Sequence, residues 1–522
     1  MMYPQLELRF RQYLICALAC LVLLILLMGV FTPWWQTPDD ALMYSLAHGV
    51  GGMVQATDHL VFINILWGRL ISHIPDIAGV RGYTTATYGV MVISCLVMLY
   101  WLMRWGIGPW FSILTVTALF SYPFLNPQFT FTSGMAAAAG VIALYCYTEK
   151  GMIGGLATFM VMCSLSMLIR VGECALLVFC AIPLLISWKA LKDWKLYATA
   201  AVLLAVLGGS LWMDNRAYEE DGWKEFKAFQ KQRAILLDNN GVEFLKNVVT
   251  EDDGITKNDL DMQDYYLLVD RDLRNGEVWA KILEKHGKER PLIMHSLRDG
   301  VHSLLGLFIF LPDLYRRDRP IRGMALCMLG IFLLYPNRRI AVVFGIFSVL
   351  VFIIGTIRGS LALLRVFYPV QTMIIVGQIF FISRISFENI RWIRFCINLC
   401  KKYIKLISPK RMIVFFSICL LFLVLGTNIK RVVYSKEFHY SLIKKTIADF
   451  KEISRDSRGK ILFVRPDQKF EMLFAPFSRT EDQPDLPFYT LNWTINAPVA
   501  RSHILEQGEE SFFEKRFRSD DG

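Results

Sequence analysis

Two adjacent carboxylates stand directly after an apolar run that is long enough to cross a membrane. Asp39 and Asp40 lie in "QTPDDALMYSLAHG" (36–49), which follows the uncharged run "YLICALACLVLLILLMGVF" (13–31). Because adjacent carboxylates repel each other, one can hold its proton to a higher pH and suit general-base catalysis, and the pair could also bind a divalent cation. The alternative is structural: "TPDD" is good helix N-cap chemistry, and capping needs only one of the two.

A charged pair also stands where two apolar runs meet. Arg170 and Glu173 in "LIRVGE" (168–173) share one face of a predicted helix, so a structural salt bridge is one interpretation. Charge at membrane depth is costly and points to function. The functional interpretation is an Arg that binds a lipid phosphate, with the Glu holding it.

Three further arginines are candidates for binding a phosphate, since a guanidinium presents a bidentate fork of donors. Arg233 lies in "WKEFKAFQKQRAILLDNN" (223–240), and Arg358 and Arg365 lie in "RGSLALLRVFYP" (358–369). The first segment has Trp223, Phe226 and Phe229 at helical spacing, so it is also interpreted as a helix lying on the membrane surface.

Asp58 and His59 precede a short amphipathic stretch, "LVFINILWGRLISHIP" (60–75), which we expect at the membrane interface. Asp58 and His59 are also candidates for binding the substrate or its phosphate. Surface or capping roles are the alternative. A metal cluster with His48 and His73 would match no recognisable ligand spacing.

The composition is that of a polytopic membrane protein, because 54% of the 522 residues are hydrophobic and 19% are charged. The first apolar run is expected to be a retained span. Eleven runs are candidate spans. They lie near 13–33, 84–103, 109–125, 131–147, 152–169, 173–188, 196–213, 296–312, 340–357, 363–383 and 412–428. A shorter run, 323–335, would make twelve if it crosses on its own.

Charge predicts which side each loop faces. The segment 384–411 holds eight Lys/Arg and one Glu, whereas 214–299 holds 14 basic and 19 acidic residues. Under the positive-inside rule, Arg104, Lys150, "RRDRPIR" (316–322) and 384–411 are cytoplasmic. The predicted outer parts are 34–83, 214–299 and 430–522. The net charge of +11 therefore reports topology, and no nucleic-acid partner is expected.

Two domains are expected. Residues 1–429 would form the transmembrane part, and 430–522 a small extracytoplasmic α/β unit with a helix over 437–453 and a strand over 460–466. We interpret the eleven cysteines as small apolar residues that fill space in the packing. Nucleotide-driven pumping is disfavoured because no phosphate-binding G-x-x-x-x-G-K-[ST] motif occurs.

The acidic pair after a first span, in "TPDDALMY", resembles the GT-C glycosyltransferases, membrane enzymes that use polyprenyl-phosphate-linked sugars. The sequel 45–75 is similar to the first-loop amphipathic region of bacterial members. "NPQFTFTSG" (126–134), "IRVGE" (169–173) and the Trp223…Arg233…Asp238 region resemble bacterial proteins of that kind. The resemblance covers roughly residues 1–370.

This resemblance implies a GT-C-like helical bundle in a bacterial cytoplasmic membrane, with an extracytoplasmic active face. It implies a polyprenyl-phosphate-linked sugar as donor and a glycan or glycolipid as acceptor. Asp39 would be the base with Asp40 as its partner, and Arg170, Arg233 and Arg365 would bind the phosphate. "NPQF" carries no acid where a second D-x-D motif would stand, so we expect metal-independent transfer of a single sugar, without a cofactor.

Two other classes stay open at this stage. A surface-polysaccharide polymerase or ligase would also have many spans, a large outer loop and arginines for a lipid phosphate. A transporter or flippase for lipid-linked glycans would need charged residues deep inside several spans, and the sequence offers only Arg170 and Glu173.

Overall fold

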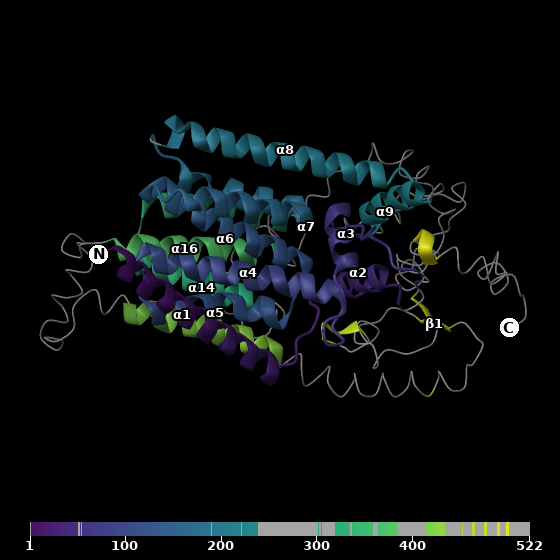
Figure 1. Ribbon diagram of the computed structural model, residues 1–522, viewed down its shortest axis with the longest axis horizontal. Coiled ribbons are helices and arrows are strands. Elements are labelled where there is room, and N and C mark those ends of the chain that lie inside the picture. The colour runs from purple at the N-terminus through teal and green to yellow at the C-terminus, as the bar shows by residue number, and fades with distance from the viewer. Residues whose placement is uncertain are drawn as a thin grey trace, which may run out of the picture. The chain divides into compact units, whose positions relative to one another are not determined.

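The computed structural model describes most of the first 238 residues and shorter stretches after them. The described residues are 2–50, 53, 55–188, 190–220, 222–238, 301, 304, 319–334, 337–358, 364–384, 414–433, 452, 462–464, 474–477, 488–490 and 497–500. Almost all of them are helical (Figure 1).

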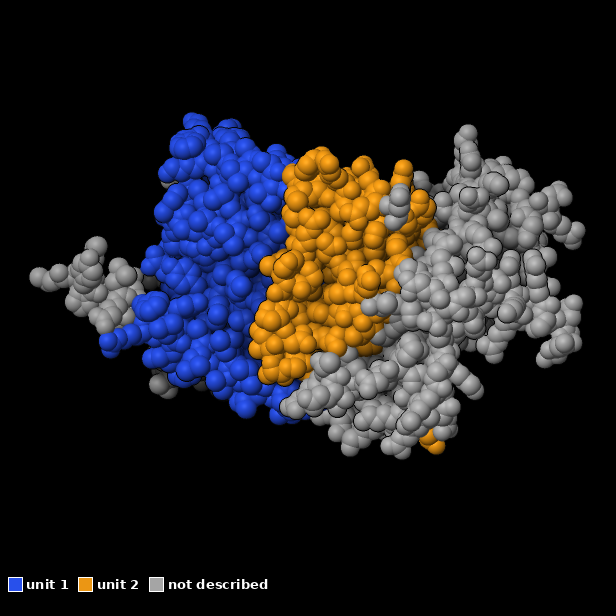
Figure 2. Space-filling view, turned by 45° about the vertical axis from the view of Figure 1, so that its right-hand side comes forward, with its two compact units in different colours: residues 1–36, 87–208, 295–439 blue, residues 37–86, 209–294, 440–522 orange. Residues whose placement is uncertain are grey.

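The chain divides into two compact units, which are coloured in Figure 2. Unit 1 is residues 1–36, 87–208 and 295–439, and unit 2 is residues 37–86, 209–294 and 440–522. The predicted outer segments therefore group with the tail, whereas the sequence suggested that only 430–522 stands apart from the membrane part.

Unit 1 is a bundle of long apolar helices that run lengthwise beside one another (Figure 1). Its helices are α1 (Met2–Val30), α5 (Pro109–Leu125), α6 (Phe129–Lys150), α7 (Gly154–Leu185), α14 (Arg319–Leu334), α15 (Arg338–Arg358), α16 (Leu364–Ser383) and Val414–Val433. Two more helices, α4 (Gly82–Trp105) and α8 (Trp194–Ala217), have residues in both units, and η1 (Ala190–Lys192) precedes α8.

Seven helices among the described residues are long and apolar enough to cross a membrane, so this is a helical membrane protein. They begin at Phe10, Gly82, Phe129, Gly154, Trp194, Arg365 and Val414. The predicted run 296–312 lies almost wholly outside the described residues, and the count of eleven or twelve spans stays a prediction.

One of these seven, α7, is two helices joined at Arg170, whose backbone is extended at φ −160°, ψ 104°. In a straight helix the carbonyl oxygen of Cys163 and the thiol of Cys174 would lie ~16 Å apart along the axis. They lie 3.8 Å apart, so the chain doubles back. The two predicted runs 152–169 and 173–188 correspond to these halves. Each half is only ~23 Å long.

Glycines let α6 and the first half of α7 approach closely. A Cβ on Gly140 would lie 3.1 Å from Met162 Cβ, and one on Gly155 would lie 2.3 Å from the carbonyl oxygen of Ala143. Gly140 therefore meets the middle of the first half of α7, and Gly155 meets α6 near its C-terminal end. The two helices run antiparallel at backbone contact.

Two glutamines fix the direction of α14 relative to α16. Gln371 Nε2 donates to the carbonyl oxygen of Ile321 at 3.1 Å, and Gln378 Nε2 donates to that of Met328 at 2.9 Å. Both contacts have the same offset along the chain, so the helices run in parallel. Because α16 ends at the same end of unit 1 as Lys150, the residues 319–322 lie at the opposite end. The prediction that "RRDRPIR" (316–322) shares the side of Lys150 is thus wrong for its described part.

Unit 1 consequently has two chemically distinct ends. The basic end is defined by Lys150, Arg339 and Arg384 around Glu149. The polar end is defined by residues 126–134, 170–173 and 365–372. Since α6 spans 22 residues, these ends are separated by ~33 Å, about the thickness of a membrane.

Unit 2 contains α2 (Pro38–His48), α3 (Ile65–His73) and α9 (Trp223–Asp238). It also contains β1 (Leu462–Val464) and β2 (Phe488–Thr490), which pair in parallel. The strand β1 lies inside the segment 460–466 for which a strand was predicted, but the helix predicted over 437–453 lies almost wholly outside the described residues. An α/β unit over 430–522 therefore stays a prediction.

The close approach of α6 and α7 gives a test with neighbouring residues. We expect Gly155→Ala to destabilise the protein by about 1–3 kcal/mol, because its methyl group overlaps a backbone oxygen that cannot rotate away. Gly154→Ala is the matched control, since its Cβ would meet only Trp101 at 3.9 Å. Thermal unfolding in detergent measures both, and equal midpoints for the two variants would contradict this packing.

Candidate functional site

The polar end of unit 1 brings together three of the predicted residues. Arg170 Nε lies 3.9 Å from Glu173 Oε1, and the guanidinium of Arg365 also interacts electrostatically with this carboxylate. The side chain of Glu173 is 6% exposed, whereas that of Arg170 is 38% exposed. The guanidinium group of Arg170 is therefore partly exposed, whereas the carboxylate that it contacts is buried.

The fold positions these residues at the tip of a hairpin. Arg170 is the extended residue at which α7 doubles back, and Ser133 Oγ of α6 donates to its carbonyl oxygen at 3.1 Å. The guanidinium of Arg170 lies over the ring of Phe129, 5.1 Å from its centroid. Arg365 occupies the first turn of α16, which starts at this same end. Their convergence follows from three helix ends meeting.

The polar end also carries buried polar atoms that accept or donate no hydrogen bond among the described residues. They are Asn126 Nδ2, both amide atoms of Gln128, Thr130 Oγ1, Glu173 Oε2, Gln371 Oε1 and Thr372 Oγ1. Burying such groups without partners costs about 1–3 kcal/mol each. A cluster of them at one end of an apolar bundle is the arrangement expected where a polar ligand supplies the partners.

The cations of this set suit an anion. Arg170 and Arg365 place two guanidinium groups beside the single buried acid, Glu173. Arginine forms paired hydrogen bonds with phosphate oxygens. The polar end can therefore bind one phosphate group.

The acidic pair belongs to the first turn of α2, but its two members differ. Asp40 is wholly buried, and it accepts hydrogen bonds from Tyr83 Oη at 3.0 Å and from Thr37 Oγ1 at 3.1 Å. Asp39 is partly exposed. Asp40 thus anchors the helix start to α4, and Asp39 is the carboxylate that solvent can reach.

The structure gives no support for a divalent cation at this pair. Each carboxylate oxygen of Asp40 already accepts one hydrogen bond from a hydroxyl group. Among the described residues there is also no group of three or more His, Cys, Asp or Glu that could hold a metal.

The helix that carries the pair ends at a histidine kept neutral. Burial, helped by the charge of Arg81, lowers the pKa of His48 to about 4. Its Nε2 accepts a hydrogen bond from the backbone N–H of Tyr83 at 3.1 Å. Tyr83 therefore ties both ends of α2 to the start of α4, through Asp40 and through His48.

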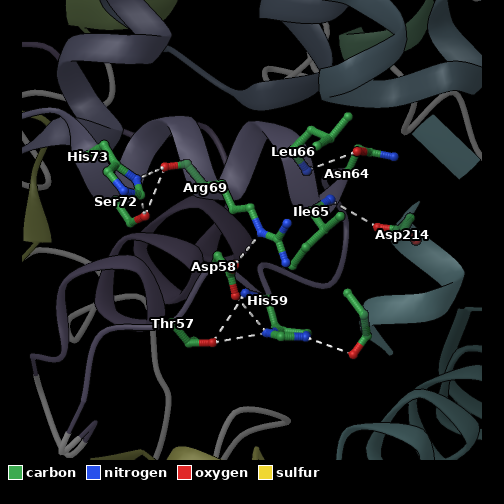
Figure 3. A network of polar contacts seen from close by, with 11 residues as sticks. Thr57, Asp58, His59, Asn64, Ile65, Leu66, Arg69, Ser72, His73 and Asp214 are labelled. Atoms are coloured by element: carbon green, nitrogen blue, oxygen red, sulfur yellow. Dashed lines mark hydrogen bonds and ion pairs between the residues drawn. The ribbon is translucent and has the colours of Figure 1, made fainter. Parts of the chain in front are cut away.

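Asp58 and His59 form a polar network inside unit 2 (Figure 3). Asp58 Oδ1 lies 2.8 Å from His59 Nδ1, and Asp58 Oδ2 accepts a hydrogen bond from Arg69 Nε at 3.0 Å. These two partners, His59 first, hold the pKa of Asp58 below its usual value against the effect of burial. The carboxylate therefore stays ionised and links the 57–59 loop to α3.

His59 serves the same network rather than a metal. Its Nε2 lies 3.1 Å from the carbonyl oxygen of Ala217, and its ring stacks on Trp223 with 4.4 Å between centroids. Both ring nitrogens are thus engaged by the protein. The sequence predicted Asp58 and His59 as substrate ligands, but their contacts join α3, α8 and α9, so we leave them out of the binding site.

The aromatic face of α9 packs inside the protein. Trp223, Phe226 and Phe229 are 7%, 0% and 3% exposed. A helix resting on the membrane surface would present these rings outward, so that interpretation of 223–240 is wrong for its described part. Arg233 lies on α9 and Arg358 ends α15, but the side chains of both lie outside the described part of the chain.

Comparisons with family models, with curated proteins and with solved structures found no match for this chain.

The buried histidine gives a pH test. An unfolded His48 takes up a proton below its ordinary pKa of 6.5, whereas the folded protein resists until about 4. The neutral ring therefore makes its full contribution to the free energy of unfolding above pH 6.5. This contribution falls as the pH drops toward 4, by about 3 kcal/mol in all. We expect His48→Gln, which keeps a hydrogen-bond acceptor, to lose less stability over this range. Parallel losses of unfolding midpoint in both proteins would contradict the account.

Proposed function

We propose that this protein is an integral membrane glycosyltransferase. It moves a sugar from a polyprenyl-phosphate carrier to a cell-surface glycan or lipid acceptor on the extracytoplasmic face of a bacterial cytoplasmic membrane. The observation that carries the proposal is the Arg170–Glu173–Arg365 cluster at the polar end of an apolar helix bundle.

The arginines of the cluster favour a donor that carries a phosphate group. A sugar joined to a lipid through one phosphate is a phosphodiester with a single negative charge, which the guanidinium groups of Arg170 and Arg365 can bind. The neighbouring unpartnered atoms of Gln128, Asn126 and Thr130 are suited to sugar hydroxyl groups, which both donate and accept hydrogen bonds.

We assign the side from the segments that the sequence predicts to be cytoplasmic. Lys150 and Arg384 lie at the basic end, and a basic excess in short loops favours the cytoplasm, whereas Arg319 and Arg322 lie at the polar end. The polar end would then face outward. Each half of α7 is only ~23 Å long, so its tip at Arg170 lies level with Ser133, about one turn inside the start of α6.

Asp39 is the proposed base. The acceptor hydroxyl attacks the anomeric carbon, and its proton passes to the Asp39 carboxylate as the new C–O bond forms. The bond between the anomeric carbon and the phosphate oxygen breaks, and the lipid phosphate leaves with the electron pair. Arg170 and Arg365 neutralise the charge that develops on it, so no strong general acid is needed. One displacement inverts the anomeric configuration.

Asp40 holds this base in place rather than reacting. Its carboxylate is buried and bonded to Tyr83 and Thr37, which fixes the first turn of α2 where Asp39 stands. The division of the acidic pair into one reacting and one anchoring residue thus rests on burial.

Two alternatives have less support. A polymerase or ligase would act on a diphosphate-linked donor, and its chemistry would reside in 214–299, most of which lies outside the described residues. A transporter or flippase would carry lipid-linked glycans across, and needs charged groups deep in several spans. Within the described helices of unit 1, Arg170 and Arg365 lie at the polar end, and Lys150, Arg339 and Arg384 lie at the basic end.

The proposed roles separate in enzyme kinetics. With polyprenyl-phosphate-linked hexoses as donors, we expect Asp39→Asn to lower kcat by about 10²–10⁴-fold with little change in KM. Arg170→Gln and Arg365→Gln should raise the KM for the donor and lower kcat, because both bind the donor phosphate and also stabilise the charge that develops as it leaves. Lys195→Gln, which removes an exposed cation elsewhere, is the control. Full activity of Asp39→Asn would overturn its role as base.

A further inference from the structure

The basic end of unit 1 holds a second cluster, which the proposed transfer reaction does not use. Glu149 accepts hydrogen bonds from Arg339 Nη1 at 2.6 Å and from Arg384 Nη1 at 2.5 Å. Lys150 Nζ donates to the carbonyl oxygen of Trp105 at 2.7 Å. The cluster joins the ends of α4, α6 and α16 to the start of α15.

An indole ring stands between two of these cations. Lys150 Nζ lies 4.0 Å from the centroid of Trp105, and Arg384 Cζ lies 4.2 Å from it. Trp105 Nε1 in turn donates to Ser383 Oγ at 2.9 Å. This cation–π pairing fixes the two positive groups near each other without neutralising either charge.

The cluster is left with a positive excess that faces outward. Lys150, Arg339 and Arg384 contribute three positive charges and Glu149 one negative charge, which leaves +2. The side chains of Arg339 and Arg384 are 39% and 36% exposed, whereas that of Glu149 is 17% exposed. Each guanidinium has five N–H donors, and only a fraction of them serve Glu149.

The position of the cluster favours a lipid headgroup as the anion that it binds. The cluster lies at the ends of apolar helices that are fit to cross a membrane, where lipid headgroups lie. A tryptophan beside cations is also typical of that depth. Basic pockets between helix ends on the cytoplasmic side bind phosphate-bearing headgroups.

We propose that Arg339, Arg384 and Lys150 bind the phosphate of an anionic phospholipid headgroup at the basic end of unit 1. Glu149 holds the two guanidinium groups in position, and Trp105 orients Lys150 and Arg384. A bound lipid then stabilises the junction of four helix ends. This site is distinct from the polar end, so its failure would leave the proposed transfer reaction standing.

Thermal unfolding of the whole detergent-purified protein tests the site, with a short-chain phosphatidylglycerol as probe and a short-chain phosphatidylcholine as the uncharged reference. We expect phosphatidylglycerol to raise the midpoint of the wild-type protein. Arg384→Gln should weaken the apparent affinity about fivefold to tenfold, and Arg339→Gln should do the same. Lys195→Gln removes an exposed cation outside the cluster and should leave the affinity unchanged.

Two further arms keep the proposal falsifiable. Tyr145→Phe removes a buried hydroxyl without a hydrogen-bond partner among the described residues and leaves every charge in place, so its lipid response should match that of the wild type. If the arginine variants unfold at a lower temperature, this variant shows whether a change in packing alone alters the response to lipid. An equal midpoint rise with inorganic phosphate would overturn the lipid assignment, and an unchanged lipid affinity in both arginine variants would overturn the site.

Discussion

The structure of unit 1 depends on how a carboxylate can be buried in an apolar helix bundle. Glu173 lies at the tip of α7 with its side chain 6% exposed, and removing a charge from water costs several kcal/mol unless cations compensate it. Arg170 and Arg365 offset part of that cost, because the hairpin tip of α7 and the first turn of α16 meet at one end. The buried acid thus lies where two guanidinium groups come together.

The basic end of unit 1 also pairs an acid with cations, but in a different arrangement. Glu149 is bonded to two arginines, and a third cation rests on the ring of Trp105, so the acid is over-compensated. Each end of the bundle therefore pairs one acid with more than one cation. The two clusters are the two separate lipid-phosphate sites that we propose.

Much of this arrangement could be predicted from the sequence, because helices in a membrane are dictated by apolar length. The runs around α1, α4, α6 and α16 were visible, and so was the charged pair Arg170–Glu173. Other features depend on contacts between distant residues. Nothing local to "TPDD" reveals that Tyr83 binds Asp40, and the aromatic spacing of Trp223, Phe226 and Phe229 cannot distinguish a membrane-facing stripe from a buried one.

The side assigned to Arg319 and Arg322 was wrong for a related reason. The positive-inside rule counts charges, whereas the position of α14 is set by Gln371 and Gln378, which donate to its backbone carbonyls. A glutamine inside an apolar run gives no indication of its partner from sequence alone. Likewise, the separation of Asp39 from Asp40 rests on burial, which repulsion between neighbours does not predict.

The most direct test of the central claim is the lipid product of the reaction. Purified protein in vesicles is supplied with lipid-linked sugars and an acceptor extract, and the lipids are analysed by mass spectrometry. The account predicts polyprenyl monophosphate in equal amount to the sugar transferred, with loss of both in Asp39→Asn. Release of polyprenyl diphosphate, or transfer that persists in Asp39→Asn, would contradict it.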